Sequence, residues 1–392
     1  MRTHPIDELR AKLHDGSAVV GGVLSGTSAD GIDVALVRFE RAAELGTPRV
    51  LAFDTLPFEA ELALRVRAVL DGAPTGLREC ALLSRDLGRA FGRALRDVAR
   101  RSALEPDLVG SHGQTVWHHD GCEASGAATL QLGDGDEVAE HSGCAVVSDF
   151  RTRDIACGGE GAPVSALADD LIFAELPRPA AVLNLGGMAN LTFLSDEAAL
   201  DARAFDCGPA NSLLDGLARR LLSQPFDRDG ARAMQGTPHK ALLDELMAHE
   251  FLKRAPPKST GRDTFGESWV LSVVARARAM GVTRDEDLLA TAADFVALSV
   301  ARALREHGAP VHWLVVCGGG VHHARVMNTL ALHCPHPLAS GADFGVDPDA
   351  REAVVFATLA ARNVLAVPTT KPNATGARAG RALGKLSWPV LA

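Results

Sequence analysis

Apolar and polar residues along this chain form a repeating series of strand-like and helix-like segments. Short apolar runs such as 18–25 and 32–40 indicate strands, whereas apolar residues at helical spacing, as at Leu83, Leu87 and Phe91, indicate a helix. In the first half we predict strands at 18–25, 32–40, 50–58, 107–111 and 145–150, and helices at 61–70, 77–101, 133–142 and 163–175. This half therefore has the order β-β-β-α-β-α-β-α.

The same order starts again after a chain break predicted at Pro177-Arg178-Pro179. In the second half we predict strands at 180–185, 190–194, 202–205, 311–317 and 337–340, helices at 211–222, 321–333 and 348–365, and a helical insertion at about 238–307. The sequence thus predicts two α/β lobes, 1–177 and 178–392, with the last helix, 348–365, returning toward a central ATP cleft. This duplicated architecture is that of the actin-like ATPase and sugar-kinase superfold, which is ribonuclease H-like.

A glycine-rich loop joins the first two predicted strands. Its small residues and hydroxyls let backbone N–H groups approach phosphate oxygens, and its two aspartates suit a Mg²⁺ ion bound with the phosphates. An ordinary glycine-rich hairpin turn explains the loop equally well when it is taken alone. A second hairpin turn is predicted at Gly186-Gly187, so a nucleotide's phosphates could lie between the two. The candidate cofactor-binding residues of the first loop are Ser25, Gly26, Thr27, Ser28, Ala29, Asp30, Gly31, Ile32 and Asp33.

Composition and charge narrow the class of protein. The length of 392 residues suggests two domains, and 47% hydrophobic with 23% charged residues is ordinary for a soluble globular protein. The formal net charge of −9 argues against nonspecific nucleic-acid binding, and no apolar run reaches the roughly 18 residues of a membrane span. The polar N-terminal stretch lacks a signal-like apolar core, and seven scattered cysteines without a C-x-x-C pair fit a reduced compartment. We expect a cytoplasmic protein with no nucleic-acid or membrane partner.

Seven further loops are too polar and too rich in glycine to belong to a core. Together with S-G-T-S-x-D-G-x-D at 25–33, they closely resemble, in order, the motifs of the anhydro-N-acetylmuramic acid kinases, from about Gly22 to about Ala360. One glycine motif would be weak evidence, but eight in one order are specific. The sequence departs from the family pattern at Glu160, Ala210, Asp263 and His323. The seven loops are 110–115 (GSHGQT), 149–154 (DFRTRD), 158–163 (GGEGAP), 184–190 (NLGGMAN), 205–211 (FDCGPAN), 258–262 (KSTGR) and 317–320 (CGGG).

The resemblance implies an ATP-dependent kinase of cell-wall (peptidoglycan) recycling. In that reaction, ATP, water and 1,6-anhydro-N-acetylmuramic acid give N-acetylmuramic acid 6-phosphate and ADP. Water opens the anhydro ring while O6 takes the γ-phosphoryl group. The resemblance also implies ATP and Mg²⁺ as cofactors, a small anhydrosugar as substrate, and a homodimer. The residues present suit this chemistry, because phosphoryl transfer needs charge neutralisation and positioning, and an attacking water needs a base.

Three carboxylates are candidates for activating the water. Asp206 follows a predicted strand and precedes a helix, and it matches the aspartate of the family's F-D-x-G-P motif, to which the role of base is assigned. Its alternative role is to cap that helix. Glu352, at the start of the last long helix, resembles the second carboxylate that holds the water, or it complements the helix dipole. Asp154 is the rival base, although pairing with its two neighbouring arginines suits it better.

The loops after two predicted strands offer donors for the sugar. Arg151 and Arg153 could bind the substrate's carboxylate or polarise its leaving oxygen, although arginine pairs more often form surface ion pairs. His112 and Thr115 could donate to sugar hydroxyls, although a lone histidine is often structural. We therefore expect substrate binding by His112, Thr115, Arg151, Arg153 and Asp154.

The remaining nucleotide contacts are predicted in the second half of the chain. Three consecutive glycines lie between a buried strand and a helix, where backbone can approach adenosine or phosphate, or where strand and helix simply pack closely. The Mg²⁺ ligands stay unassigned, and adjacent histidines such as His118-His119 point to opposite faces of a strand, which disfavours a zinc site. The cofactor-binding residues predicted in this half are Asn184, Gly186, Gly187, Gly208, Gly318, Gly319 and Gly320.

Two other functions stay open at this point. An ordinary sugar kinase of the same superfold would need a base for a hydroxyl group and would consume no water. An actin-like or chaperone-like ATPase would turn over slowly, and no sugar would change its rate.

Overall fold

The computed structural model describes residues 5–26, 29, 31–41, 45–120, 125–196 and 203–390. The chain forms two compact units, residues 1–175 with 350–392 and residues 176–349. These bounds differ from the predicted lobes, because residues 350–392 belong to the first unit. The difference arises because the last long helix packs on the sheet of the first unit.

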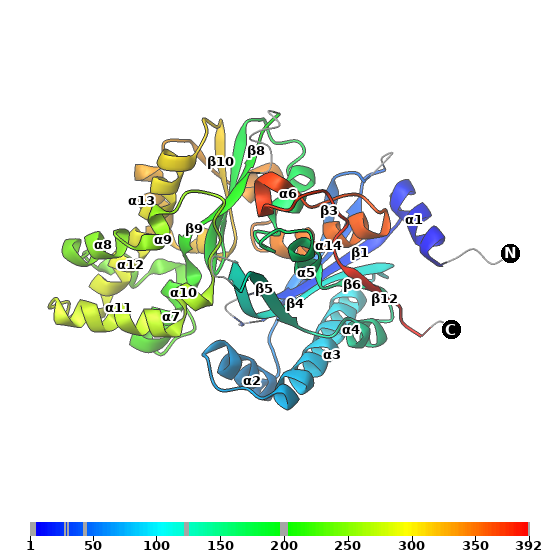
Figure 1. Cartoon of the computed structure of the whole chain (residues 1–392), viewed down its shortest axis with the longest axis horizontal. Helices are drawn as coiled ribbons and strands as arrows, with labels where there is room; N and C mark the ends of the chain where they lie inside the picture. Colours follow the sequence, from blue (N-terminus) through cyan, green and yellow to red (C-terminus); the bar gives the residue numbers. More distant parts are fainter. Residues whose placement is uncertain are drawn as a thin grey trace. The chain divides into compact units, whose positions relative to one another are not determined.

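The first unit is built on a seven-stranded sheet in the order β12-β6-β4-β1-β2-β3, with β5 paired to β4 (Figure 1). Strands β1, β2 and β3 form an antiparallel meander, and β1, β4 and β6 run parallel. All residues of β1 are buried, as expected for a central strand covered on both faces. The strands are β1 (Val19–Ser25), β2 (Ile32–Phe39), β3 (Pro48–Leu56), β4 (Leu108–Asp120), β5 (Ala127–Leu132), β6 (Ala145–Ser148) and β12 (Lys385–Ser387).

Helices cover both faces of this sheet. Gly21 and Gly22 are neighbours on β1, so side chains at these positions would point to opposite faces. A Cβ atom at Gly21 would meet Leu95 of α3, and one at Gly22 would meet Ala353 of α14, so α3 and α14 lie on opposite faces (Figure 1). The helices of this unit are α1 (Pro5–Asp15), α2 (Ala60–Leu70), α3 (Leu77–Arg101), α4 (Gly135–Ser142), α5 (Phe150–Ala156), α6 (Ala166–Ile172), α14 (Arg351–Val364) and α15 (Pro372–Thr375).

Two glycines let α14 approach the sheet closely. A methyl group at Gly22 would lie 1.8 Å from the carbonyl oxygen of Ala353, and one at Gly110 would lie 2.0 Å from that of Phe356. Only a residue without a side chain fits at these two positions. This packing on β1 and β4 explains why the last long helix belongs to the first unit rather than to the second.

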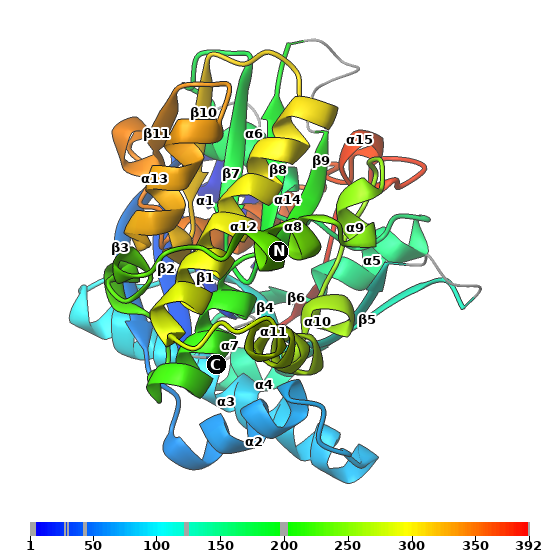
Figure 2. The same ribbon diagram turned by 90° about the vertical axis from the view of Figure 1, so that its left-hand side faces the viewer.

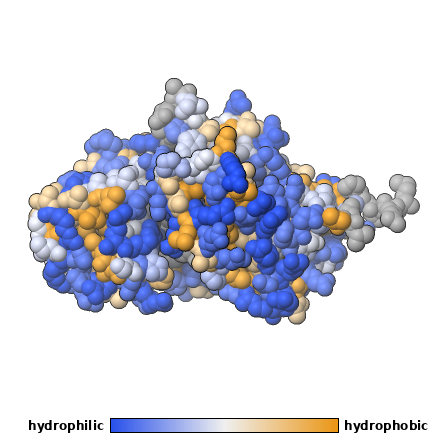
Figure 3. Space-filling model, turned by 90° about the horizontal axis from the view of Figure 1, so that it is seen from below, coloured by the Kyte–Doolittle hydropathy of each residue, from blue (hydrophilic) through white to orange (hydrophobic). Residues whose placement is uncertain are grey.

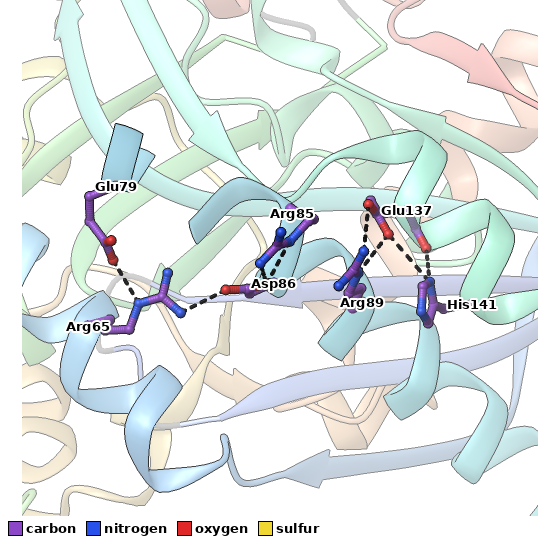
Figure 4. A network of polar contacts seen from close by, with 7 residues as sticks. All are labelled: Arg65, Glu79, Arg85, Asp86, Arg89, Glu137 and His141. Atoms are coloured by element: carbon purple, nitrogen blue, oxygen red, sulfur yellow. Dashed lines mark hydrogen bonds and ion pairs between the residues drawn. The ribbon is translucent and has the colours of Figure 1, made fainter. Parts of the chain in front are cut away.

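A network of ion pairs ties α2, α3 and α4 together at the surface (Figure 4). Arg65 of α2 donates to Glu79 and to Asp86 of α3, at 2.7 Å in each case. Arg89 of α3 donates to Glu137 of α4 at 2.9 Å. Figure 4 shows Arg65 and Arg89 turned toward carboxylates on a neighbouring helix, whereas Arg85 pairs with Asp86 on its own helix.

The second unit is built on a five-stranded sheet in the order β11-β10-β7-β8-β9. Strands β7, β8 and β9 are antiparallel, and β7, β10 and β11 run parallel. The long helix α12 packs against β9 and against α7, α8 and α13, and Figure 2 shows it beside the sheet. The strands are β7 (Ala180–Leu185), β8 (Met188–Leu194), β9 (Ala204–Pro209), β10 (Trp313–Cys317) and β11 (Leu338–Ser340).

The insertion predicted at 238–307 consists of helices, most of which contribute to one core with the sheet. The α-helices of the second unit are α7 (Asn211–Leu222), α8 (Lys240–Met247), α9 (Glu250–Lys253), α10 (Arg262–Phe265), α11 (Glu267–Ala279), α12 (Asp285–His307) and α13 (Ala324–His333). Its 3₁₀ helices are η1 (Arg228–Gly230), η2 (Ala233–Gln235), η3 (Gly319–His322) and η4 (Gly341–Phe344).

The two sheets share one topology. Strands β3-β2-β1-β4-β6 of the first unit correspond in order and direction to β9-β8-β7-β10-β11 of the second. Each series starts with an antiparallel meander and continues with two parallel strands reached through helices. The predicted duplicated α/β fold of the actin-like ATPase and sugar-kinase superfold is therefore confirmed.

Several elements differ from the prediction. Strand β4 continues to Asp120, well beyond the predicted end at 111, and forms a hairpin with β5, which was not predicted. The segment 149–154, predicted as a loop, belongs largely to helix α5. The C-terminal tail adds β12 to the sheet beside β6, a strand that was not predicted. These segments are short or polar, and their structure depends on partners distant in sequence.

The surface is largely polar. The face in Figure 3 is mostly hydrophilic, with hydrophobic residues in small separate groups. Of the helices in the described ranges, none is both long and apolar enough to cross a membrane.

Candidate functional site

The first glycine-rich hairpin ends in buried polar atoms. Ser25 closes β1 and is only 2% exposed, and its neighbour on β4 in the parallel register is Gln114. Gln114 Nε2 donates to the carbonyl oxygen of Gly26 at 3.1 Å, whereas Ser25 Oγ and Gln114 Oε1 find no hydrogen-bond partner among the residues described. Burying such atoms unpaired is costly, so this end of β1 suits a ligand with donors and acceptors of its own.

The turn of this hairpin is tight. Ala29 has a φ of 51° and donates its N–H to the carbonyl oxygen of Gly26 at 3.1 Å. Gly31 lies against β3, where a Cβ atom would come within 2.8 Å of Thr55. Ile32 is buried, and Asp33 on β2 accepts a hydrogen bond from Thr55 Oγ1 at 2.7 Å. Of the predicted nucleotide ligands in this loop, Thr27, Ser28 and Asp30 lie outside the described residues.

The second hairpin turn is fixed to the start of α7. Backbone N–H groups of Ala210 and Asn211 donate to the carbonyl oxygens of Gly187 and Gly186 at 2.9 and 3.0 Å. The side chain of Asn211 donates to Leu185 at 3.1 Å. The first N–H groups of α7 therefore hold the turn between β7 and β8 against the start of this helix.

Three glycines after β10 pack against the same turn. Gly318 has a φ of +82°, and a Cβ atom there would lie 2.8 Å from Asn184 Oδ1. A Cβ atom at Gly320 would lie 2.6 Å from Leu185, whereas one at Gly319 would have nothing closer than 3.7 Å. The structure thus brings together the predicted residues Asn184, Gly186, Gly187 and 318–320. Gly208, which has a φ of +144°, lies near the end of β9.

Buried His112 pairs with half-buried Arg151 in the first unit. Arg151 Nε donates to His112 Nε2 at 2.9 Å, and Arg151 Nη1 donates to the carbonyl oxygen of Gly161 at 2.8 Å. The other ring nitrogen, Nδ1, lies 3.2 Å from the carbonyl oxygen of Gly113, to which it donates as the protonated nitrogen. Burial, and then the nearby guanidinium, hold the pKa of His112 well below its usual value, so the ring is neutral.

Asp154 holds the loops around this pair rather than facing a ligand. It is fully buried, and its two oxygens accept from Thr375 Oγ1 at 2.7 Å and from the N–H of Gly161 at 2.9 Å. Burial raises the pKa of Asp154, and these hydrogen bonds oppose the shift. A carboxylate with both oxygens occupied by neighbouring loops is a poor candidate for the base that activates water.

The two arginines of α5 do not lie together. Arg151 points to His112, whereas Arg153 is exposed and lines a hollow with residues of the C-terminal tail. Thr115 lies on β4 near His112 in sequence, is half-buried, and accepts from Gln131 Nε2 at 3.2 Å. Of the residues predicted to bind sugar, the structure thus groups His112, Arg151 and Asp154, and separates Arg153 from them.

Asp206 lies within β9, an edge strand of the second sheet, rather than after a strand as predicted. The K-S-T-G-R loop, 258–262, holds it there. The carboxylate is 4% exposed, and its Oδ2 accepts from the backbone N–H of Thr260 at 2.8 Å. The N–H of Asp206 donates to the carbonyl oxygen of Lys258 at 3.0 Å. These contacts fix the carboxylate against an adjacent loop instead of the N–H groups at the start of α7, so helix capping does not explain it.

Lys258 is a further residue of this region whose role the sequence did not indicate. Its side chain is buried, and its Nζ lies 4.9 Å from the centre of the Phe251 ring. Burial lowers the pKa of Lys258, opposed by attraction to Cys207 and Asp206. The K-S-T sequence resembles the end of a phosphate-binding loop, yet here its backbone positions Asp206.

Glu352 lies in the first turn of α14 and is partly buried. Its neighbour Arg351 forms a fully buried ion pair with Asp169 of α6, with Arg351 Nε 3.0 Å from Asp169 Oδ1. This pair fixes the start of α14, and with it the backbone of Glu352. The sequence offered no signal for the pair, because 182 residues separate its members.

His323, one of the departures from the family pattern, has a structural role. Its Nδ1 accepts from the N–H of Val326 at 3.4 Å and caps α13. An imidazole nitrogen here replaces the side-chain oxygen that usually caps a helix. No group of three histidine, cysteine or acidic side chains placed to hold a metal ion occurs in the described part of the chain.

Known proteins resemble nearly the whole chain. A solved structure of an activator of 2-hydroxyisocaproyl-CoA dehydratase from Clostridium difficile, with bound ADPNP, is 13% identical, with a TM-score of 0.43 over 88% of this chain and 95% of that one. The family model for anhydro-N-acetylmuramic acid kinase matches residues 18–389. Proteins of that name are 39% identical in Salinibacter ruber, over 98% of this chain and 100% of the relative, and 39% identical in Xanthomonas oryzae pv. oryzae, over 95% and 98%. The chain belongs to the anhydro-N-acetylmuramic acid kinase family.

Proposed function

We propose that this protein uses ATP and water to convert 1,6-anhydro-N-acetylmuramic acid to N-acetylmuramic acid 6-phosphate and ADP, in the recycling of cell-wall sugars. Water forms a bond to C1 as the bond from C1 to the bridging oxygen breaks. That oxygen, O6, bonds to the γ-phosphorus as the bond to the leaving ADP breaks. The attacking water gives up one proton, so the site needs a base.

The buried carboxylate of Asp206 carries the proposal. One oxygen accepts from Thr260 N–H, which orients the carboxylate, and Asp206 lies within β9, the edge strand that pairs with β8 of the second hairpin. A carboxylate fixed in this way can accept the proton of a water molecule. Glu352 is proposed as the second carboxylate of the reaction.

Each glycine-rich hairpin is proposed as a phosphate-binding turn for ATP. The unpaired Ser25 Oγ supports this role in the first unit. In the second unit, the glycines 318–320 beside the turn 186–187 support it, because even a Cβ atom at Gly319 would meet nothing closer than 3.7 Å. When bound with ATP, Mg²⁺ neutralises phosphate charge, and Asp33 is a carboxylate of the first hairpin that fits such an ion. Thr115 and Arg151 are proposed to contact the sugar, and neutral His112, whose two ring nitrogens pair with Gly113 and Arg151, is proposed to position Arg151.

The Asp206→Asn substitution tests the proposal. It keeps the size of the side chain but removes the base, so we expect ADP release with the anhydrosugar to be abolished while ATP binding stays near normal. Asp244→Asn, an exposed change in the same unit, is the matched control and should leave turnover unchanged. A near wild-type rate for Asp206→Asn would exclude Asp206 as the base.

Labelled water separates this reaction from that of an ordinary sugar kinase. We expect ¹⁸O from the solvent at C1 of the product, whereas simple phosphoryl transfer to a hydroxyl would leave the sugar unlabelled. A rate that no sugar changes would instead indicate an ATPase that acts on a partner. We further propose that the protein is cytoplasmic and forms a homodimer. Measuring its molecular mass in solution tests the dimer.

A further inference from the structure

A hollow of about 330 Å³ lies between α5 and the C-terminal tail of the first unit. Arg153, Ala156 and Cys157 line it from α5 and the residue that follows, and Arg378, Ala379 and Arg381 line it from the tail. The lining therefore contains three guanidinium groups and no carboxylate.

The guanidinium groups that line the hollow are not neutralised by carboxylates in the described part of the chain. Within the described ranges, no carboxylate oxygen lies within the 4.0 Å of an ion pair from Arg153, Arg378 or Arg381. Arg378 Nε donates to the carbonyl oxygen of Cys157 at 3.3 Å, and Arg381 Nη1 donates to that of Gly380 at 2.8 Å. Because a guanidinium has five N–H donors, most of theirs are left over. The arginines of Figure 4, by contrast, have carboxylate partners.

The hollow is separate from the proposed sugar-binding residues. Arg151 and Arg153 are two residues apart on a helix, a rotation of roughly 200° at 3.6 residues per turn. Arg151 faces His112 and Gly161, and Arg153 faces the hollow. One helix thus presents two arginines to two different places.

The tail that carries Arg378 and Arg381 is held in place by hydrogen bonds. The N–H of Arg378 donates to the carbonyl oxygen of Cys157 at 3.0 Å, and that of Arg381 donates to Thr370 Oγ1 at 2.7 Å. Thr370 Oγ1 in turn donates to the carbonyl oxygen of Ala379 at 2.7 Å. Thr375 Oγ1 ties the same segment to Asp154. Because the backbone is already ordered, a ligand that binds here loses little free energy in ordering it.

We propose that this hollow binds a small molecule that carries a phosphate group. Guanidinium groups match phosphate oxygens in planar, paired hydrogen bonds, and three positive charges suit a dianion better than a single carboxylate. The volume lies at the lower end of small-molecule sites, which are roughly 300 to 1,000 Å³, so it suits a phosphate with a small organic group. The chain as a whole has a net charge of −9, so this concentration of positive charge is a local feature.

Inorganic phosphate is the probe for the first test. It is titrated calorimetrically into the full-length protein, with the nucleotide site filled by a non-hydrolysable ATP analogue. We expect one phosphate site per chain in the wild type, weakened roughly tenfold or more in Arg378→Gln with Arg381→Gln, since each removes charge-assisted hydrogen bonds. Arg49→Gln, an exposed arginine on β3, is the matched control and should bind phosphate normally. Equal phosphate affinity in the double variant and the wild type would overturn the proposal.

A second measurement uses the wild-type protein and does not depend on a variant that folds. Cys157 lines the hollow and is partly exposed, as are Cys80 and Cys334 elsewhere in the chain. Alkylation by iodoacetamide is monitored by mass spectrometry of the peptide that contains each cysteine. We expect phosphate to slow the alkylation of Cys157, while Cys80 and Cys334 react at unchanged rates. Alkylation of Cys157 that phosphate does not slow would overturn the proposal.

Discussion

The buried ion pair between Asp169 and Arg351 should be essential for the stability of the first unit. The two side chains are 0% and 1% exposed, and Arg351 Nε lies 3.0 Å from Asp169 Oδ1. The Asp169→Asn substitution keeps the shape of the side chain but removes the negative charge of Asp169 beside the buried guanidinium. We therefore expect the start of α14 to detach from α6 more readily.

The size of the effect follows from burial. Removing one partner of a buried pair costs about 3 to 5 kcal/mol, because the remaining charge has left water without compensation. Replacing both partners by apolar residues of similar volume, Asp169→Leu with Arg351→Met, removes that uncompensated charge. The double variant should therefore be more stable than Asp169→Asn. Asp97→Asn is the control, since its pair with Arg100 is exposed on α3 and should contribute within about 0.5 kcal/mol.

Unfolding should be followed in the first unit specifically, because a chain of two units need not unfold in one step. Hydrogen exchange of peptides from α14 and β1, measured across a urea series, provides this. A loss below about 1 kcal/mol for Asp169→Asn would refute the reasoning, since removing one partner of a buried ion pair should cost more than that. A double variant as unstable as Asp169→Asn would refute it independently, by showing that packing rather than charge controls the effect.

Two further predictions concern the same unit. The neutral ring of His112 resists protonation in the folded state, whereas the unfolded side chain titrates near 6.5, so stability should be lost as pH falls below that value, by up to about 1.4 kcal/mol per pH unit. His112→Gln should reduce this slope between pH 6.5 and about 5 in urea unfolding, and an unchanged slope would contradict the burial of an uncharged ring. Gly110→Ala would place a methyl group 2.0 Å from the carbonyl oxygen of Phe356, so it should destabilise the first unit by about 1 to 3 kcal/mol. Gly76→Ala, where an added methyl meets nothing within 4 Å, should cost much less in the same thermal unfolding assay.

Elements with a strong local pattern could be predicted from the sequence. Helices α3 (Leu77–Arg101) and α7 (Asn211–Leu222) have the predicted bounds, because their apolar residues recur at helical spacing. The two hairpins, β1–β2 and β7–β8, also occur where glycine-rich turns separate apolar runs. The duplicated order of these elements was sufficient to predict the superfold.

Features that depend on distant partners could not be predicted in this way. The periodicity of α14 indicates a helix but not which sheet it covers, since that depends on Gly22 and Gly110 more than 200 residues earlier. Strand β12 has only three residues, too few for a pattern, and exists because β6 offers an edge. The separation of Arg151 from Arg153 follows from α5 being a helix, whereas a loop would have left their directions open.

The discontinuous first unit has a consequence for how the protein forms during synthesis. Residues 176–349 are complete when the ribosome has made them, so the second unit can acquire its core while translation continues. The first unit must wait for α14 and β12, which cover β1 and β4 and extend the β6 edge. The face of its sheet that α14 covers is therefore exposed for most of the time of translation. The protein should depend on chaperones at this stage more than one in which each domain is a single continuous segment.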